Sequence, residues 1–199
     1  MTLLQKYTPK TINDIILDDK AMDAIIAFAN GWMGGFPNMD RPALLLHGKQ
    51  GTGKTMTARA ICKDCDFAII ELNASTSRTK DRLKSLFNIP KTDFFGNKTC
   101  LFLDEADSLF DSSESTIKKV IMQMKFPVIL AANNNFKVPK MLRDVSEEIK
   151  FWEPKVEKLK QHLLKINKEE GLCLSIELIN AAAETRDYRL ALGMLEEKQ

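Results

Sequence analysis

Residues 48–55 read Gly48-Lys-Gln-Gly-Thr-Gly-Lys-Thr55, which satisfies the pattern G-x-x-x-x-G-K-[ST] at every defined position. In this pattern the glycines let backbone N–H groups turn inward around the phosphates of a nucleotide. Lys54 places a positive charge between the β- and γ-phosphates, and the hydroxyl of Thr55 can hold a magnesium ion. The segment therefore predicts a phosphate-binding loop for ATP with Mg²⁺.

The flanks of this loop provide the structural setting that it requires. Pro42-Ala-Leu-Leu-Leu-His47 is a short apolar run opened by a proline, which is typical of a buried parallel strand. Residues 56–63 suit a helix whose positive N-terminal end faces the same anion. We assign nucleotide contacts to the whole segment, at Gly48, Gln50, Gly51, Thr52, Gly53, Lys54, Thr55 and Met56.

The composition of the chain excludes several classes of protein. Its 199 residues, 44% hydrophobic and 28% charged, favour a soluble globular protein of one domain plus a small one. A net charge of +2 gives no general attraction to nucleic acid, so DNA contacts need local patches. The sequence contains no apolar run long enough to indicate a membrane span. Its first residues lack the long apolar stretch that is typical of a secretory signal. We expect an intracellular protein, in cytoplasm or nucleoid, or in a eukaryotic nucleus.

Four cysteines raise the question of a metal or redox site. Cys62 and Cys65 form a C-x-x-C pair, but no second pair or nearby histidine completes a zinc site. We favour packing of this pair within the helix after the loop. With Cys100 and Cys173, they are expected to be free thiols.

The rest of the chain alternates between strand-like and helix-like segments. Further strands are predicted at 67–72, 99–104, 127–132 and 147–151. Helices are predicted at 19–33, 57–64, 79–88 and 114–125, after an extended arm at 1–18. Such alternation predicts an α/β fold, a parallel five-stranded sheet with helices on both faces.

The pattern changes after residue 153. Residues 154–169 place apolar side chains on one helical face, Gly171 can end that helix, and Ser175 and Asp187 can each open another. We therefore predict a nucleotide-binding domain at 1–153 and a small all-helical lid domain at 154–199.

Two acids follow the strand predicted at 99–104. Leu101-Phe-Leu-Asp104-Glu105 runs from apolar residues directly into the acids, at the strand edge where open α/β sheets bind ligands. Asp104 is placed to orient Mg²⁺, and Glu105 to polarise an attacking water. Asn133 ends the next strand and could hold that water or contact the γ-phosphate. An asparagine-rich turn is an equal alternative on spacing alone.

Basic residues elsewhere carry weaker signals. Arg189, in the predicted lid, could reach the γ-phosphate, although a solvated helix arginine is the simpler interpretation. Arg78 and Arg82 lie in one basic cluster, and Lys118 with Lys119 form another. Phosphate-backbone binding needs such charges on one surface, but charge-rich exposed helices have the same composition.

Taken together, the chain resembles the AAA+ ATPases of sliding-clamp loaders, the replication factor C family. Lys6-Tyr-Thr-Pro-Lys10 resembles the family's N-terminal box, although Thr8 replaces an arginine. Glu71-Leu-Asn-Ala-Ser75 resembles the family's E-L-N-A-S-D box, with Thr76 in place of the aspartate. The resemblance implies that Tyr7 and Pro9 contact the adenosine.

The same resemblance gives roles to two residues. Asn133 falls on the sensor 1 position. Arg189 falls on the sensor 2 arginine of the G-D-x-R motif, although Arg186 replaces its glycine. Both are therefore expected to act in catalysis with Lys54, Asp104 and Glu105, and Arg189 also to contact the nucleotide.

One family motif is missing. Small clamp-loader subunits supply an arginine finger from a Ser-Arg-Cys motif, which would fall here at Asp144-Val145-Ser146; Arg143 is two residues early. This departure, with residues 126–133 and the region of Trp32, makes the chain more similar to large subunits. We expect it to receive an arginine finger and not to supply one.

The implied function is that of a clamp-loader ATPase. Its partners would be small subunits, a sliding clamp and primer–template DNA, with Arg78, Arg82, Lys118 and Lys119 on the phosphate backbone. A collar domain is not found within 199 residues, so assembly through a collar is not expected. The alternatives are a nucleotide-dependent scaffold with little turnover, or another AAA+ class such as an initiator or a Holliday-junction motor.

Overall fold

The computed structural model describes residues 2–15, 17, 19–34, 40–74, 90–109, 111–123 and 126–197. The chain divides into two compact units. We call residues 9–48 and 54–151 the sheet unit, and residues 1–8, 49–53 and 152–199 the lid unit. The domain limits 1–153 and 154–199 stay a prediction.

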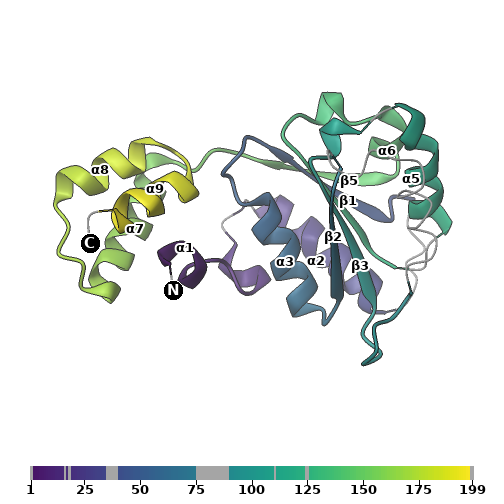
Figure 1. Ribbon diagram of the computed structural model, residues 1–199, viewed down its shortest axis with the longest axis horizontal. Coiled ribbons are helices and arrows are strands. Elements are labelled where there is room, and N and C mark those ends of the chain that lie inside the picture. The colour runs from purple at the N-terminus through teal and green to yellow at the C-terminus, as the bar shows by residue number, and fades with distance from the viewer. Residues whose placement is uncertain are drawn as a thin grey trace. The chain divides into compact units, whose positions relative to one another are not determined.

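The sheet unit is built on a five-stranded sheet (Figure 1). The strands are β1 (Ala43–Gly48), β2 (Ala68–Asn73), β3 (Thr99–Asp104), β4 (Val128–Ala132) and β5 (Ser146–Phe151). They follow the order β2-β3-β4-β1-β5, and every neighbouring pair is parallel. Each strand begins and ends within one residue of its predicted position, and the predicted α/β class is confirmed.

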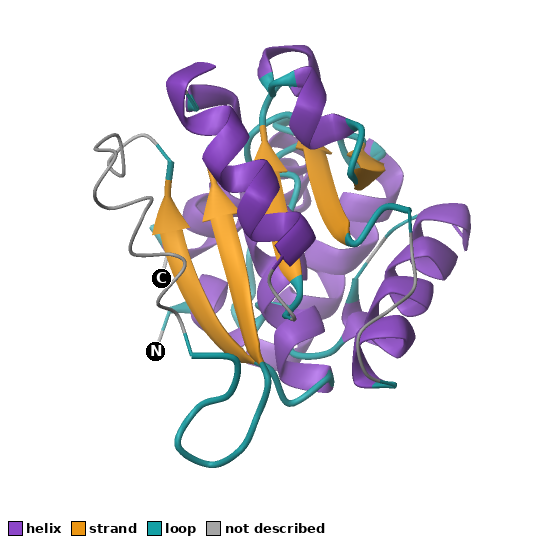
Figure 2. Ribbon diagram, turned by 90° about the vertical axis from the view of Figure 1, so that its right-hand side faces the viewer, coloured by secondary structure: helices purple, strands orange, loops and turns teal. Residues whose placement is uncertain are grey.

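Helices cover both faces of the sheet, as Figure 2 shows. On one face α2 (Asp19–Met33) and α3 (Lys54–Asp64) pack over Leu44 and Leu46 of β1. On the other face α5 (Asp111–Gln123) and the short α6 (Lys140–Arg143) pack over Leu45. Because successive strand residues point to opposite faces, the continuous apolar run of β1 supplies both cores.

Helix ends differ more from the predictions than strand ends do. The predicted limits of α2 are confirmed, whereas α3 begins three residues earlier than predicted, at Lys54. The helix predicted at 114–125 begins at Asp111 and ends at Gln123. The predicted helix 79–88 lies outside the described residues.

The extended arm predicted at 1–18 is wrong in part, because it contains α1 (Leu3–Lys6) and a 3₁₀ turn, η1 (Ile12–Asp14). Thr2 and Gln5 form a capping box that satisfies the first backbone N–H groups of α1. Leu3 is buried among the lid helices, and its backbone N–H donates to Glu196. Local capping and burial of one leucine therefore stabilise a helix in this arm.

The lid unit contains α7 (Val156–Glu170), α8 (Ile176–Glu184) and α9 (Tyr188–Glu196). Gly171, with φ of +62°, ends α7. Ser175 and Asp187 cap α8 and α9 by accepting hydrogen bonds from their first backbone N–H groups. Gly171 thus ends a helix, and Ser175 and Asp187 each begin one, as predicted.

The cysteines of the C-x-x-C pair lie in the core of the sheet unit. Cys62, Cys65 and Cys100 are all buried there, and every cysteine is a free thiol. Burial raises the pKa of Cys65 to about 11, which keeps it a neutral thiol at pH 7. The expected packing role of Cys62 and Cys65 is confirmed. Among the described residues, no helix is long and apolar enough to cross a membrane.

Candidate nucleotide-binding site

Three neighbouring strands of the sheet unit end at the candidate site. Gly48 ends β1, Asp104 ends β3, and Asn133 follows β4, the strand that lies between them. Because parallel strands deliver their carboxyl ends to one edge, residues far apart in sequence meet there. This edge is where the sequence places the phosphate-binding loop.

The loop uses backbone conformations that favour glycine. Gly48, Gly51 and Gly53 have φ angles of +147°, +77° and +99°. At Gly48 space is limiting as well, since an added Cβ would lie 2.2 Å from the carbonyl oxygen of Phe151 on β5. Only glycine satisfies both conditions at position 48 without moving the neighbouring strand.

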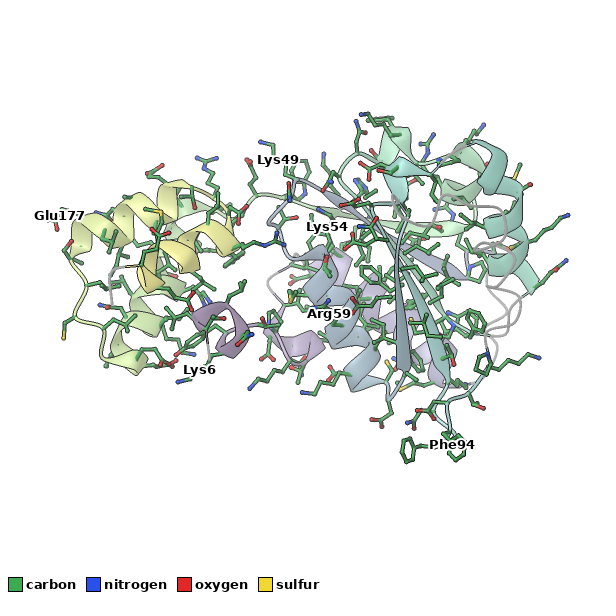
Figure 3. The ribbon with its side chains drawn as sticks, in the orientation of Figure 1. Lys6, Lys49, Lys54, Arg59, Phe94 and Glu177 are labelled. Atoms are coloured by element: carbon green, nitrogen blue, oxygen red, sulfur yellow. The ribbon has the colours of Figure 1, made fainter. Side chains whose placement is uncertain are left out.

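Lys54, the first residue of α3, reaches across the strand ends. Its Nζ donates to the carbonyl oxygen of Gly48 over 2.7 Å and to Oδ1 of Asn133 over 3.2 Å. The residue, which is labelled in Figure 3, is only 8% exposed. A partly desolvated cation at this edge of the sheet can attract a phosphate.

Thr55 and Asp104 form the second pair at this edge. The Thr55 hydroxyl donates to Oδ2 of Asp104 over 3.0 Å. Both side chains carry oxygen atoms of the kind that bind metal ions, and both residues are half-buried. This donor set fits Mg²⁺, which prefers one or two protein oxygens and completes its shell with water and phosphate. Thr55 and Asp104 are thus brought together as the sequence predicts, and they would hold the ion.

Glu105 adopts a strained backbone conformation. Its φ of +56° and ψ of +40° lie in the left-handed region, which is uncommon for a residue with a side chain. Its backbone N–H donates to Oδ1 of the preceding Asp104 over 2.9 Å, which fixes the turn. Such strain clusters at functional sites, where the surrounding fold maintains it.

Asn133 is solvent-exposed apart from its contact with Lys54, so its amide remains accessible at the strand edge. The next residue, Asn134, belongs to a turn of its own: its side chain caps η4 (Asn135–Lys137). The two alternatives for the asparagine run therefore fall on different residues, since Asn133 contacts Lys54 and Asn134 forms the turn.

One contact of α3 was not predicted. Arg59 donates from Nε and Nη2 to the two carboxylate oxygens of Glu71 over 2.7 and 2.8 Å. Glu71 lies on β2 and opens the Glu71–Ser75 box. The Arg59 hydrogen bonds lower the pKa of Glu71, which stabilises its ionised form. The helix that begins with Lys54 is thereby fastened to the edge strand.

The lid unit holds the remaining nucleotide candidates, apart from Pro9. Arg189 is exposed, and its backbone N–H donates to Oδ1 of Asp187 over 2.7 Å. Arg186, which replaces the motif's glycine, has φ of +52°. The position therefore keeps the conformation that glycine would adopt most easily.

Tyr7 also belongs to the lid unit. Its hydroxyl oxygen lies 2.5 Å from Glu170 and 3.0 Å from Glu169, so its single proton is donated between these two carboxylates. Its ring packs edge-on against His162. The hydrogen bond to Glu170, followed by burial, raises the pKa of Tyr7, so the phenol stays protonated. Pro9 lies in the sheet unit.

The predicted DNA contacts are described only in part. Lys118 and Lys119 lie on α5, where Lys119 is exposed and Lys118 half-exposed. Arg78 and Arg82 lie outside the described residues. Arg143, next to the missing arginine-finger motif, is half-buried at the end of α6, and its Nε is enclosed without a hydrogen-bond partner.

These features define a P-loop nucleotide-binding fold. A model of the family described as "ATPase family associated with various cellular activities (AAA)" matches residues 44–153, from the second residue of β1 to two residues beyond β5. The chain belongs to this family and is a P-loop ATPase by class.

Within that class, the chain is similar to replication factor C large subunits. It is 32% identical to the protein of Pyrococcus horikoshii and 34% identical to that of Pyrococcus abyssi, over 197 residues in each case. These alignments cover 97% of this chain and 42% and 41% of the two relatives. The chain thus spans about two fifths of the length of the relatives that it matches.

A solved structure extends the comparison to the fold. The chain resembles the Thermotoga maritima RuvB Holliday junction branch migration motor with a TM-score of 0.78. The match covers 96% of this chain and 64% of that one at 17% identity. At this identity the likeness shows a shared fold and nothing about substrate.

Proposed function

We propose that this chain is the ATP-binding and ATP-hydrolysing part of a sliding-clamp loader, in which ATP drives clamp opening and loading onto primer–template DNA. The observation that carries this assignment is the alignment of 97% of the chain with replication factor C large subunits. The proposed partners are small clamp-loader subunits, a sliding clamp and the phosphate backbone of DNA.

The residues of the site would have different roles in ATP hydrolysis. The loop from Gly48 to Met56 binds the phosphates, and Lys54 neutralises charge that develops on the γ-phosphate. Mg²⁺, when bound by Thr55 and Asp104, would neutralise the phosphate oxygens. Glu105 accepts the proton of the attacking water. Asn133, already in contact with Lys54, orients that water.

The lid contributes residues that respond to the nucleotide. Arg189 contacts the γ-phosphate from the lid, and Tyr7 and Pro9 contact the adenosine. The lid would close when ATP binds and open after hydrolysis, so that clamp and DNA are bound and released in turn. Lys118 and Lys119, with Arg78 and Arg82, would hold DNA through its phosphates without reading its sequence.

The chain is further proposed to receive a catalytic arginine from a neighbouring subunit. Residues 144–146 contain no arginine, and the half-buried side chain of Arg143 is a poor substitute. An arginine supplied in trans raises turnover by about 10³–10⁵-fold. Low turnover by the chain alone is therefore part of the proposal.

ATP turnover in a series of mixtures tests this function. We expect slow turnover alone, a small rise with primed DNA, and a rise of orders of magnitude only when clamp and small subunits are also present. Glu105→Gln should lower turnover by about 10²–10⁴-fold in every mixture and retain ATP binding, which controls for contaminating ATPases. Tight binding without turnover in any mixture would favour the scaffold. Full stimulation by branched DNA without a clamp would favour a junction motor.

A further inference from the structure

We infer that Asp187 is a positioning residue whose carboxylate lies beside the phosphate-binding loop and opposes nucleotide phosphate there through its charge, so that ATP binding is coupled to the start of lid helix α9. The inference rests on the proposed nucleotide binding by residues 48–56. It concerns contacts within the lid unit alone, between residues 49–53 and the turn that precedes α9.

The carboxylate of Asp187 lies directly on Gly51. A Cβ added at Gly51 would lie 1.8 Å from Oδ2 of Asp187, 2.2 Å from its Cγ and 2.5 Å from its Oδ1. The acid therefore occupies the volume that a side chain at position 51 would need. Gly51 also has φ of +77°, so both its conformation and its neighbour require glycine.

Asp187 is held in this place from its own side. Its Oδ1 accepts hydrogen bonds from the backbone N–H groups of Arg189, over 2.7 Å, and Leu190, over 3.1 Å. Its backbone N–H and carbonyl both contact the hydroxyl of Thr185, each over 3.3 Å. The same carboxylate thus caps α9 and touches the loop, which fixes the backbone of Arg189 relative to residues 49–53.

The loop segment is held as well. Lys49 Nζ forms an ion pair with Glu153 over 2.6 Å, and the Thr52 hydroxyl donates to the carbonyl oxygen of Lys49 over 2.8 Å. Thr52 is only 8% exposed. Asp187 therefore meets a segment with a defined shape.

The direction of the effect of Asp187 on ATP affinity follows from the charges involved. Loops of this type bind anions through their backbone N–H groups, and a carboxylate on the loop is an anion of the chain itself. A triphosphate brings several further negative charges to the same segment, and repulsion between them is strong in a partly desolvated site. Binding of ATP therefore acts against the charge of the Asp187 carboxylate, and this cost lowers the affinity for ATP.

Asp187→Asn separates this role from helix capping, because asparagine caps helices about as well as aspartate does but carries no charge. We expect Asp187→Asn to bind ATP about tenfold more tightly, within the usual range of coupling between sites. The gain should become smaller at 1 M salt, where the screening length is about 3 Å. Fluorescence titration with an ATP analogue at two salt concentrations measures both effects.

A matched control comes from the neighbouring helix. Ser175 caps α8 in the same unit through a hydrogen bond from the Leu178 N–H, so Ser175→Ala removes a cap without removing a charge. It should lower the melting temperature and leave the dissociation constant for ATP unchanged. Asp187→Ala should lower the melting temperature and still tighten ATP binding, provided that it folds.

The outcomes separate the inference from the proposed function. An Asp187→Asn chain that binds ATP as the wild type does, or more weakly, would overturn the inference while nucleotide binding stands. A gain of equal size in Ser175→Ala, or one that is undiminished at high salt, would assign the effect to lid stability and also overturn it. Failure of the wild-type chain to bind ATP would overturn both proposals.

Discussion

The hydroxyl of Thr55 donates a hydrogen bond to the Asp104 carboxylate over 3.0 Å, linking the first turn of α3 to the end of β3. The sequence predicts each residue as a magnesium ligand for a separate reason, Thr55 from the phosphate-binding loop and Asp104 from the acids that follow an apolar strand. Their proximity brings two oxygen ligands to one place on the sheet edge.

We therefore expect Thr55→Val to weaken Mg²⁺-dependent ATP binding by roughly 10–100-fold, comparable to other losses around metal sites. Valine keeps the shape of threonine but lacks the hydroxyl. ATP binding measured in EDTA should change little, because the phosphate contacts of the loop persist. Thr92→Val, at an exposed threonine before β3, is the matched control. Equal losses with and without Mg²⁺ would show that Thr55 does not hold the ion.

Glu105 leads to a second prediction. Glu105→Gln should lower the turnover number by about 10²–10⁴-fold, the usual contribution of a general base, with the affinity for ATP nearly unchanged. Glutamine preserves size and cannot accept the proton. Glu157→Gln, at an exposed residue of α7, controls for the loss of one negative charge. Single-turnover assays with quantified ATP binding separate the two steps, and retained turnover would remove Glu105 from the mechanism.

The strands and the chemistry of the site could be predicted, whereas contacts between distant elements could not. Apolar runs such as residues 99–104 mark buried strands wherever they occur, and their polar endings mark the sheet edge. The contact of Asp187 with Gly51 depends on how a turn in the lid unit meets the loop, and no local pattern records it. The left-handed backbone of Glu105 also leaves no signal in residue type.

The N-terminal helix α1 was not predicted, although the sequence contains a pattern that indicates it. Thr2 and Gln5 have the spacing of a capping box, S/T-x-x-E/Q, which predicts a helix start. Residues 1–18 are nevertheless rich in polar residues around Pro9, and that composition favoured an extended arm. The capping pattern is therefore a better guide to this helix than average composition is.

The Arg59–Glu71 pair leads to a prediction about pH. The folded pKa of Glu71 is lowered, so its stabilising contribution is present above the unfolded pKa and lost as pH falls through the folded pKa. Both side chains are more than a third exposed, so Glu71→Gln should lower the free energy of unfolding by no more than about 1 kcal/mol at pH 7. Below the ordinary glutamate pKa of about 4.3 the difference should shrink.

Urea unfolding of wild type and Glu71→Gln across this range measures the effect. Glu147→Gln is the matched control, because Glu147 pairs with Arg41 through a single longer contact of 3.5 Å. Its effect at pH 7 should be smaller. A Glu71→Gln difference that stays constant with pH would mean that the charge of Glu71 is not its source.

Arg186 gives a prediction about stability. Its φ of +52° costs an ordinary side chain about 1–2 kcal/mol, while glycine loses part of that gain through greater freedom in the unfolded chain. Arg186→Gly should therefore raise the free energy of unfolding by about 0.5–1 kcal/mol. Gln161→Gly, at an exposed position within α7, should lower it by about 1 kcal/mol. Destabilisation by both variants would show that Arg186 is stabilised by interactions that glycine lacks.

The lysines of α5 test the proposed DNA surface. Replacing both Lys118 and Lys119 with alanine should weaken binding to primer–template DNA by a similar factor for unrelated sequences, because phosphate contacts carry no sequence information. The slope of log affinity against log salt should become shallower by up to about 0.9 for each phosphate that is no longer neutralised. Lys158 and Lys168, both exposed on α7, supply the matched double variant, which should leave affinity and slope unchanged. Anisotropy titrations with two unrelated duplex junctions at several salt concentrations measure both quantities. A weakening confined to one sequence, or an unchanged salt slope, would place the DNA-binding surface elsewhere on the chain.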